Sequence, residues 1–318
     1  MTARFLFSAN YLKVCYNKPY KTKTEDIMDY SQILSQQFNI KEEYAKNIIT
    51  LLDDGNTIPF IARYRKEMHG SMDDQLIREF AEKLEYLRGL DKRRDEIRSL
   101  IDTQEKLTDE INLALDKAAT LSELEDIYRP YRPKRKTRAS IAKEKGLEPL
   151  ANDILKQEKG FDPSKSAVDY IDEEKGVTSV EDAIQGAMDI IAELVSDNAE
   201  IRKRIRNLTN ANGVLVSVAT DEEKDSVYKN YYDYKEPVKK IAGHRVLAVN
   251  RGEKEGFLKV SVETDSEKPL NSIFRAMITD KNQLCSDIIR EACTDAYQRL
   301  IYPSIEREVR NDLTDTAA

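Results

Sequence analysis

An apolar stripe that begins after Asp73 constrains the fold of this 318-residue chain more than any other feature. Its members recur at near-heptad spacing: Leu76, Phe80, Leu84, Leu87, Leu90, Ile97 and Ile101. This spacing places the apolar side chains on one face of a long helix that packs lengthwise against another helix. Asp73 and Asp74 stand where negative charge favours the positive end of the helix dipole. The stripe therefore predicts a long central helix as the spine of a multi-helix assembly.

Most of the remaining chain also shows helical spacing, whereas two short segments alternate like strands. Further helices are expected over 108–119, 150–159, 180–195, 199–208, 242–251 and 281–300. Gly213–Val218 and Gly256–Val262 are rich in β-branched residues and predict two strands that can pair. The predicted fold class is mainly α, with a small β-ribbon in a helix-turn-helix or winged-helix-like module. A ribbon that serves only to pack against helices is an equally open interpretation.

Turn residues and composition suggest three regions along the chain. The first 24 residues carry five cations and no acid, and they show no amphipathic period. We therefore expect residues 1–27 to be an extension without stable structure. Gly176–Ser179 is the best candidate for a domain boundary, which gives an N-terminal helical domain over 28–178 and a second region over 179–318.

Charge and cysteine usage limit the possible functions. The formal net charge of −7 argues against a protein that coats nucleic acid through its overall field, so any such contact must come from local basic patches. No stretch is apolar for long enough to span a bilayer, and no membrane partner is expected. Three cysteines without a CxxC pair are typical of reduced thiols in the cytoplasm.

The basic segment between Tyr128 and Arg138 is the main candidate site. Six of the ten residues from Arg129 to Arg138 are cationic and none is acidic. Pro130 and Pro133 predict an exposed turn or a polyproline-like strand over residues 129–134, not a helix. In such a loop, cations can hold phosphates and tyrosine rings can stack on bases. The candidate nucleic-acid-binding residues are Tyr128, Arg129, Tyr131, Arg132, Lys134, Arg135, Lys136 and Arg138. Ser140 is expected to cap the helix that follows. The competing interpretation is a loop that docks on the chain's own acidic helices.

A second basic patch lies in the segment TIPFIARYRKE, residues 57–67. It contains Arg63, Arg65 and Lys66, interleaved with Phe60 and Tyr64.

Motifs for catalysis are missing from the sequence. The two histidines, His69 and His244, lack metal-ligand companions at helical spacing. No phosphate-binding loop and no G-x-S-x-G elbow occurs. We therefore expect no catalytic residue, no metal, no cofactor and no small-molecule substrate. An enzyme whose site is assembled from scattered carboxylates is the least favoured class.

Two long segments carry a resemblance to a known family. The run EDIYRPYRPKRKTRASIAKEKGLEPLA, residues 125–151, and the run TIPFIARYRKE resemble the Tex family of bacterial transcription accessory proteins. The similarity extends from Met28 to the last residue, with one departure at His69, where Thr is expected. The resemblance implies a helical N-terminal region with helix-turn-helix character, followed in the family by a YqgF-type ribonuclease-H-like domain, helix-hairpin-helix elements and an OB-fold. On this basis the chain is expected to stop before the ribonuclease-H-like domain.

The expected function follows from the resemblance and from the basic segment together. We expect the N-terminal part of a Tex-type accessory protein, a cytoplasmic scaffold in transcription that binds RNA or DNA weakly and in a salt-sensitive way. The transcription machinery is a further expected partner. The alternative is a pure protein-interaction scaffold, whose basic loop meets an acidic partner and binds no nucleic acid.

Overall fold

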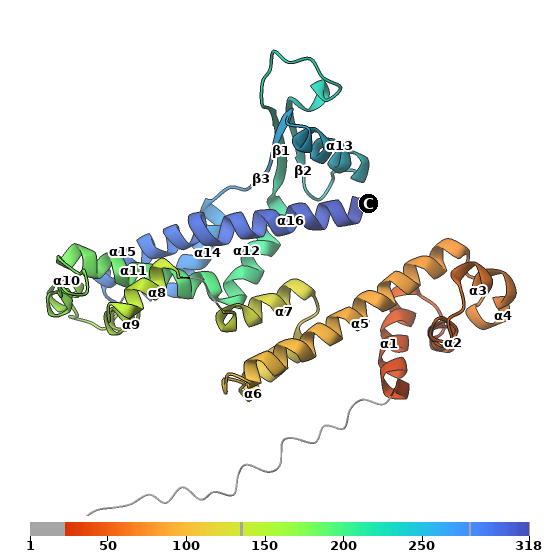
Figure 1. The fold of residues 1–318 in the computed structure, drawn as a ribbon, viewed down its shortest axis with the longest axis horizontal. Coiled ribbons are helices and arrows are strands. Elements are labelled where there is room, and N and C mark those ends of the chain that lie inside the picture. The colour runs from red at the N-terminus through yellow and green to blue at the C-terminus, as the bar shows by residue number, and fades with distance from the viewer. Residues whose placement is uncertain (1–22, 134–135, 280, 318) are drawn as a thin grey trace, which may run out of the picture. The chain divides into compact units, whose positions relative to one another are not determined.

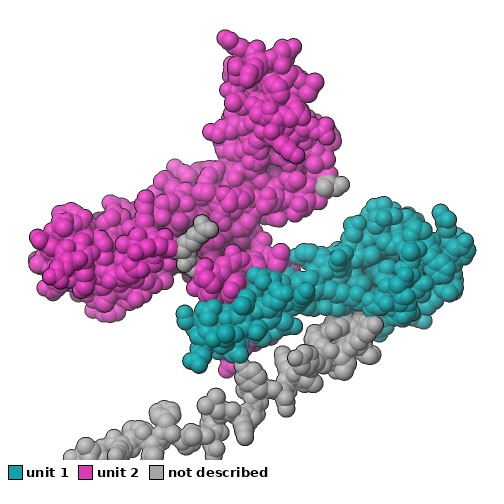
Figure 2. All heavy atoms as spheres, viewed as in Figure 1, with its two compact units in different colours: residues 1–107 teal, residues 108–318 magenta. Residues whose placement is uncertain are grey.

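The computed structural model describes residues 23–133, 136–279 and 281–317, and the chain forms two compact units (Figures 1 and 2). Unit 1 ends at Leu107 and unit 2 begins at Thr108. Helices make up most of the described residues, beside one three-stranded sheet, which confirms the mainly α fold class.

Unit 1 is built around the predicted long helix. Its helices are α1 (Lys23–Phe38), α2 (Glu42–Asp53), α3 (Ile58–Tyr64), α4 (Lys66–His69) and α5 (Asp74–Asp102). In α5 the side chains of Ile77, Phe80 and Leu84 enter the core, and the Phe38 and Phe80 rings lie 5.4 Å apart. The long helix is confirmed, although the buried stripe includes Ile77 and leaves Leu76 and Leu87 half-buried.

The first helix bears on the predicted N-terminal extension. Helix α1 begins at Lys23, five residues before the expected domain start at Met28. The rest of the extension, residues 1–22, lies outside the described residues. Its expected lack of structure stays a prediction.

A tight turn after α4 fixes the chain against α2. Gly70 has a φ of 66°, and a Cβ there would come within 2.6 Å of the Tyr44 ring. The preceding residue, His69, is fully buried, and its Nε2 lies 3.1 Å from the carbonyl oxygen of Ile61. The histidine therefore joins α4 to the C-terminal end of α3. This is a packing role, as a lone histidine usually has.

Unit 2 contains a helical core and a small sheet. Its α-helices are α6 (Asp109–Lys117), α7 (Leu121–Tyr128), α8 (Arg138–Glu144), α9 (Glu148–Lys156), α10 (Pro163–Ala167), α11 (Val180–Asp197), α12 (Ala199–Asn212), α13 (Gly243–Lys254), α14 (Glu267–Met277), α15 (Gln283–Asp295) and α16 (Tyr302–Ala317). Helix α11 lies at the centre of the core, where Ala187, Ile191 and Val195 are buried and α8, α9 and α15 pack on it.

The compact units divide at a different place from the predicted boundary at 178/179. Val177 is fully buried in the same core as α11, and its N–H donates to the carbonyl of Asp172 at 2.9 Å. Gly176, with a φ of 70°, makes the turn of this short bridge. The glycine that suggested a boundary therefore marks a tight turn inside unit 2.

The sheet contains both predicted strands and one that the pattern did not reveal. Strand β1 (Val214–Ala219) lies between β2 (Asp233–Pro237) and β3 (Leu258–Glu263), and both pairings are antiparallel. Helix α13 covers the sheet through Val249, which packs with Leu215 and Leu258. Strand β2 has charged residues and a proline instead of β-branched alternation, so its sequence gives little strand signal. The helix-turn-helix role of this module stays a prediction.

Candidate nucleic-acid interface

The basic segment leaves α7 through a short 3-10 turn, one of the two forms that were predicted, and becomes extended only after it. Helix α7 is capped by Thr120, and the turn η1 covers Arg129–Tyr131. Arg132 then adopts φ −64° and ψ 138°, the extended conformation that a following proline favours. Thr137 caps α8, and Ser140 completes a capping box with it, so the cap lies three residues earlier than expected. Lys134 and Arg135 lie outside the described residues.

Arg129 faces the interior of unit 2. Its Nε lies 3.3 Å from Oδ1 of Asp197, at the end of α11. Burial and the neighbouring Arg202 guanidinium lower the pKa of Arg129, while Asp197 and Asp126 oppose that shift. The first arginine of the segment is therefore an internal anchor, in the position that the docked-loop interpretation requires.

Arg132 and the two tyrosines form a small cluster at the surface. The Arg132 guanidinium pairs with the carboxylate of Glu125 and lies over the Tyr128 ring, 5.6 Å from its centroid. Tyr128 is buried and offers no open face to a base, whereas Tyr131 is half-buried. Within this cluster the arginine side chain is the accessible group.

Lys136 and Arg138, at the C-terminal end of the segment, are also exposed. The Lys136 side chain is 66% exposed, and its Nζ lies 3.1 Å from Oε2 of Glu144. Arg138 is exposed in the first turn of α8 and forms no ion pair with another described residue. Burial raises the pKa of Asp189, and the positive charges of Arg138 and Arg299 act against that rise. Every described cation of the segment thus has an acidic group in its surroundings.

A buried ionic network, which the sequence analysis did not find, holds α7 to α12 and α16. Arg202 is 0% exposed, and its Nη2 lies 2.8 Å from Glu308 and 3.0 Å from Ser304. Its Nε pairs with Asp126. Arg206 repeats the pattern, with Nη2 at 2.6 Å from Asp126 and 2.8 Å from Glu308. The network fixes the helix from which the basic segment departs.

The sequence held only a weak signal for this network. Arg202 and Arg206 are four residues apart and therefore on the same helical face, but α12 carries four cationic side chains. Its acidic partners come from α7 and α16, which are about 80 and 100 residues away in the sequence. Such partners cannot be chosen without the fold.

The second basic patch lies on α3 and α4 in unit 1. Arg63 and Lys66 are exposed, and the Arg65 guanidinium lies 5.4 Å from the centroid of the Phe60 ring. Tyr64 is 63% exposed beside it. The structure therefore brings the predicted cations Arg63, Arg65 and Lys66 together with two accessible aromatic rings.

Other features of the described residues concern metals, thiols and membranes. Over 23–133, 136–279 and 281–317, His, Cys, Asp and Glu side chains form no group of three or more that could hold a metal ion. Cys285 and Cys293 are buried free thiols, and burial raises the pKa of Cys293 to about 12. In the part of the chain that the structure describes, no helix has both the length and the apolar character needed to cross a membrane.

The fold and the two candidate surfaces define a mainly helical protein. Its basic segment lies among acidic side chains of unit 2, and its second basic patch carries exposed aromatic rings. Comparison with known families assigns two parts of it. Residues 28–102 match the model described as the Tex-like protein N-terminal domain, and residues 158–318 match the Tex central region-like model. The chain therefore belongs to the Tex family, as the quoted segments led us to expect.

Curated relatives agree with this assignment. The uncharacterized protein YdcI of Bacillus subtilis is 43% identical over 297 residues, which cover 91% of this chain and 41% of that protein. The transcriptional accessory protein Tex of Neisseria gonorrhoeae is 35% identical over 301 residues, 91% of this chain and 39% of the relative. The human S1 RNA-binding domain-containing protein 1 is 30% identical over 315 residues, 93% of this chain and 31% of that protein. The chain thus spans less than half the length of these relatives.

Proposed function

We propose that this chain is a non-enzymatic, cytoplasmic scaffold of the Tex type, which contacts RNA or DNA during transcription. The observation that supports it is the match to both Tex family models, together with relatives whose names include transcriptional accessory protein Tex and S1 RNA-binding domain-containing protein 1. The helix-turn-helix character of the sheet module and a partner in the transcription machinery belong to the same proposal.

Within the basic segment, the proposal assigns phosphate contact to the outward-facing cations. Arg132, Lys136 and Arg138 are exposed, whereas Arg129 is drawn inward by Asp197. Lys134 and Arg135 lie outside the described residues and remain candidates by their charge alone. Exposed ion pairs contribute roughly 0–1 kcal/mol, so a phosphate can displace the carboxylate partners of Arg132 and Lys136.

The test is the salt dependence of binding by the full chain. Fluorescence anisotropy with a labelled RNA strand and a DNA duplex should give a slope of log K against log salt of about −2 to −4, for three or four phosphate contacts. The double variant Lys136→Ala/Arg138→Ala should make that slope less negative by about 1 to 2. A Lys165→Ala variant, which changes another highly exposed cation of unit 2, should leave the slope unchanged.

The second candidate function is a pure protein-interaction scaffold, whose basic loop meets an acidic partner and binds no nucleic acid. Arg129, Arg132 and Lys136 each pair with a carboxylate of the chain, which supports a preference of this loop for acidic side chains. For such a scaffold, the wild-type chain shows no salt-dependent binding of nucleic acid and the double variant changes nothing. The anisotropy titration thus separates the two candidates.

A further inference from the structure

The outer face of α3 exposes two aromatic rings and a cation next to one another. Phe60, Arg63 and Tyr64 are three and four positions apart, so they lie on one side of the helix. Ile61 of the same helix is buried and fixes α3 to the core of unit 1. Tyr64 is 63% exposed, Phe60 is 36% exposed, and the two ring centroids are 5.3 Å apart. A planar group can therefore reach the Tyr64 ring from solvent.

The cations around these rings are free of acidic partners among the described residues. Arg65 lies over the Phe60 ring and donates to the carbonyl of Tyr64 at 3.3 Å, but neither it, Arg63 nor Lys66 forms an ion pair there. In the 11 residues of 57–67, Glu67 is the acid beside three cations. This distinguishes the α3–α4 surface from the basic segment of unit 2, where Arg129, Arg132 and Lys136 pair with carboxylates.

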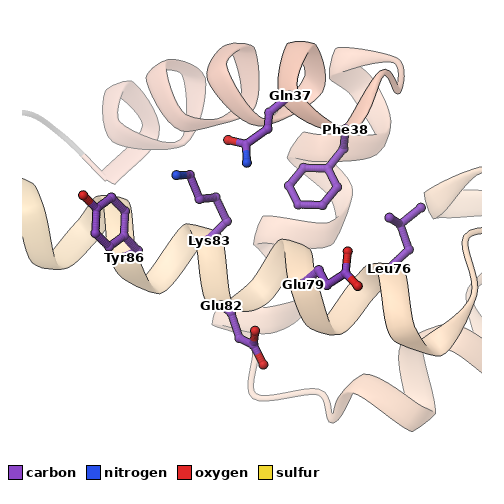
Figure 3. A pocket seen from close by; sticks show the side chains of 7 residues that line it. All are labelled: Gln37, Phe38, Leu76, Glu79, Glu82, Lys83 and Tyr86. Carbon is purple, nitrogen blue, oxygen red and sulfur yellow. The ribbon is translucent and has the colours of Figure 1, made fainter. Parts of the chain in front are cut away.

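Another exposed tyrosine in unit 1 has a cation but a different electrostatic setting. Tyr86 lies on a groove of about 590 Å³ between α1 and α5, with Lys83 Nζ 4.7 Å from its ring centroid (Figure 3). Glu79 and Glu82 line the same groove. A polyanion is repelled there by the two carboxylates, whereas the segment 57–67 around Tyr64 has one acid, Glu67, beside three cations.

We propose that the α3–α4 surface binds single-stranded nucleic acid. A base stacks on the open Tyr64 ring, and Arg63 and Lys66 contact the flanking phosphates. Every base has a π-face, so the contact tolerates any sequence, and it requires unpaired bases because a duplex does not offer their faces. The inference rests on the proposed function and names a stacking site for it on Tyr64, a ring more exposed than Tyr128 or Tyr131 of the basic segment.

The experiment measures anisotropy of labelled U12, dT12 and a 12-base-pair DNA duplex with the full chain. Tyr64→Ala should raise the Kd for both single strands about 5- to 150-fold, the equivalent of one lost base–aromatic stack. Tyr64→Phe should restore the affinity because the ring is kept. Arg63→Ala should make the slope of log K against log salt less negative by about 1, because one phosphate contact is lost. The duplex Kd should stay within twofold for Tyr64→Ala.

Matched controls keep the outcomes separate. Tyr86→Ala removes another exposed ring, 41% exposed, from the acidic groove and should leave all three Kd values unchanged. Thermal unfolding should show that Tyr64→Ala remains folded. If the wild-type chain binds single strands and Tyr64→Ala binds them equally well, the α3–α4 site is refuted while the proposed function stands. If the wild-type chain binds none of the three oligonucleotides, the proposed function fails and this site fails with it.

Discussion

At the scale of single residues, Asp126 is a buried acid of unit 2 that pairs with two arginines. Its carboxylate meets both Arg202 and Arg206, and it is 4% exposed. Removing one partner from a buried ion pair leaves an uncompensated charge, which costs about 3–5 kcal/mol. We therefore expect Asp126→Asn to lower the free energy of unfolding by that amount, as measured by urea denaturation.

The matched control is an exposed aspartate with one basic partner. Asp153 pairs with Lys156 at 2.7 Å on the surface of α9, and both side chains are well exposed. Asp153→Asn should change the free energy of unfolding by less than about 1 kcal/mol. Equal losses of unfolding free energy for the two variants would contradict the view that the buried network fixes α7, the helix from which the basic segment departs.

At the scale of the element, α5 carries the core of unit 1 on part of its length. Leu84 is 3% exposed, so Leu84→Ala should cost about 2–5 kcal/mol through lost burial and a residual cavity. Leu87 is half-buried, so Leu87→Ala should lower the free energy of unfolding by less than Leu84→Ala does. Leu100, which is exposed on the same helix, serves as the control and should change the unfolding free energy by no more than about 0.5 kcal/mol. A loss at Leu84 as small as that at Leu100 would place the core elsewhere.

The elements also show what could be predicted from the sequence. Long helices with a sustained apolar period, such as α5 and α11, were predicted close to their observed bounds because the period itself reports burial. The strand pair β1 and β3 was predicted for the same reason, whereas β2 lacks the alternation and was missed. Pairing also decides the bounds of β2, and pairing is a property of the fold.

A proline follows a π-helical stretch near the end of the chain. Helix α15 continues through this stretch, Ala296–Ile301, into α16, in which Pro303 is the second residue. Proline has no N–H to donate, and the wider π turn just before it changes the bonding register at that point. Such local adjustments depend on tertiary packing and have no signature in composition.

The cationic segments can be recognised in the sequence because their charges are clustered, and their binding role stays a prediction. The pairing of these charges cannot be read from the sequence. Arg129 meets Asp197 and Thr137 donates to Glu193 at 2.9 Å, and both acids are distant along the chain. Tyr128, an expected stacking ring, is buried in the fold.

At the scale of the whole molecule, a net charge of −7 means that nucleic acid is repelled on average. Charges more than about 8 Å away are largely screened at physiological salt, so local acids decide whether a cation can reach a phosphate. Under the proposed function, the carboxylates that pair with the basic segment compete with nucleic acid for its cations. Removing one of these carboxylates tests whether local charge or net charge decides binding. If local charge decides it, two variants with the same net charge should differ in their affinity for nucleic acid.

Glu144→Gln and Glu222→Gln provide this comparison. Both change the net charge by one unit, but Glu144 pairs with Lys136, whereas Glu222 is exposed in the loop between β1 and β2 and pairs with no described residue. Releasing Lys136 from an exposed ion pair should lower the Kd for an RNA strand about two- to fivefold. Glu222→Gln should lower it by less than about 1.5-fold, because its charge is screened from the segment. Anisotropy at 150 mM salt measures both, and equal affinities for the two variants would show that the basic segment does not contact nucleic acid.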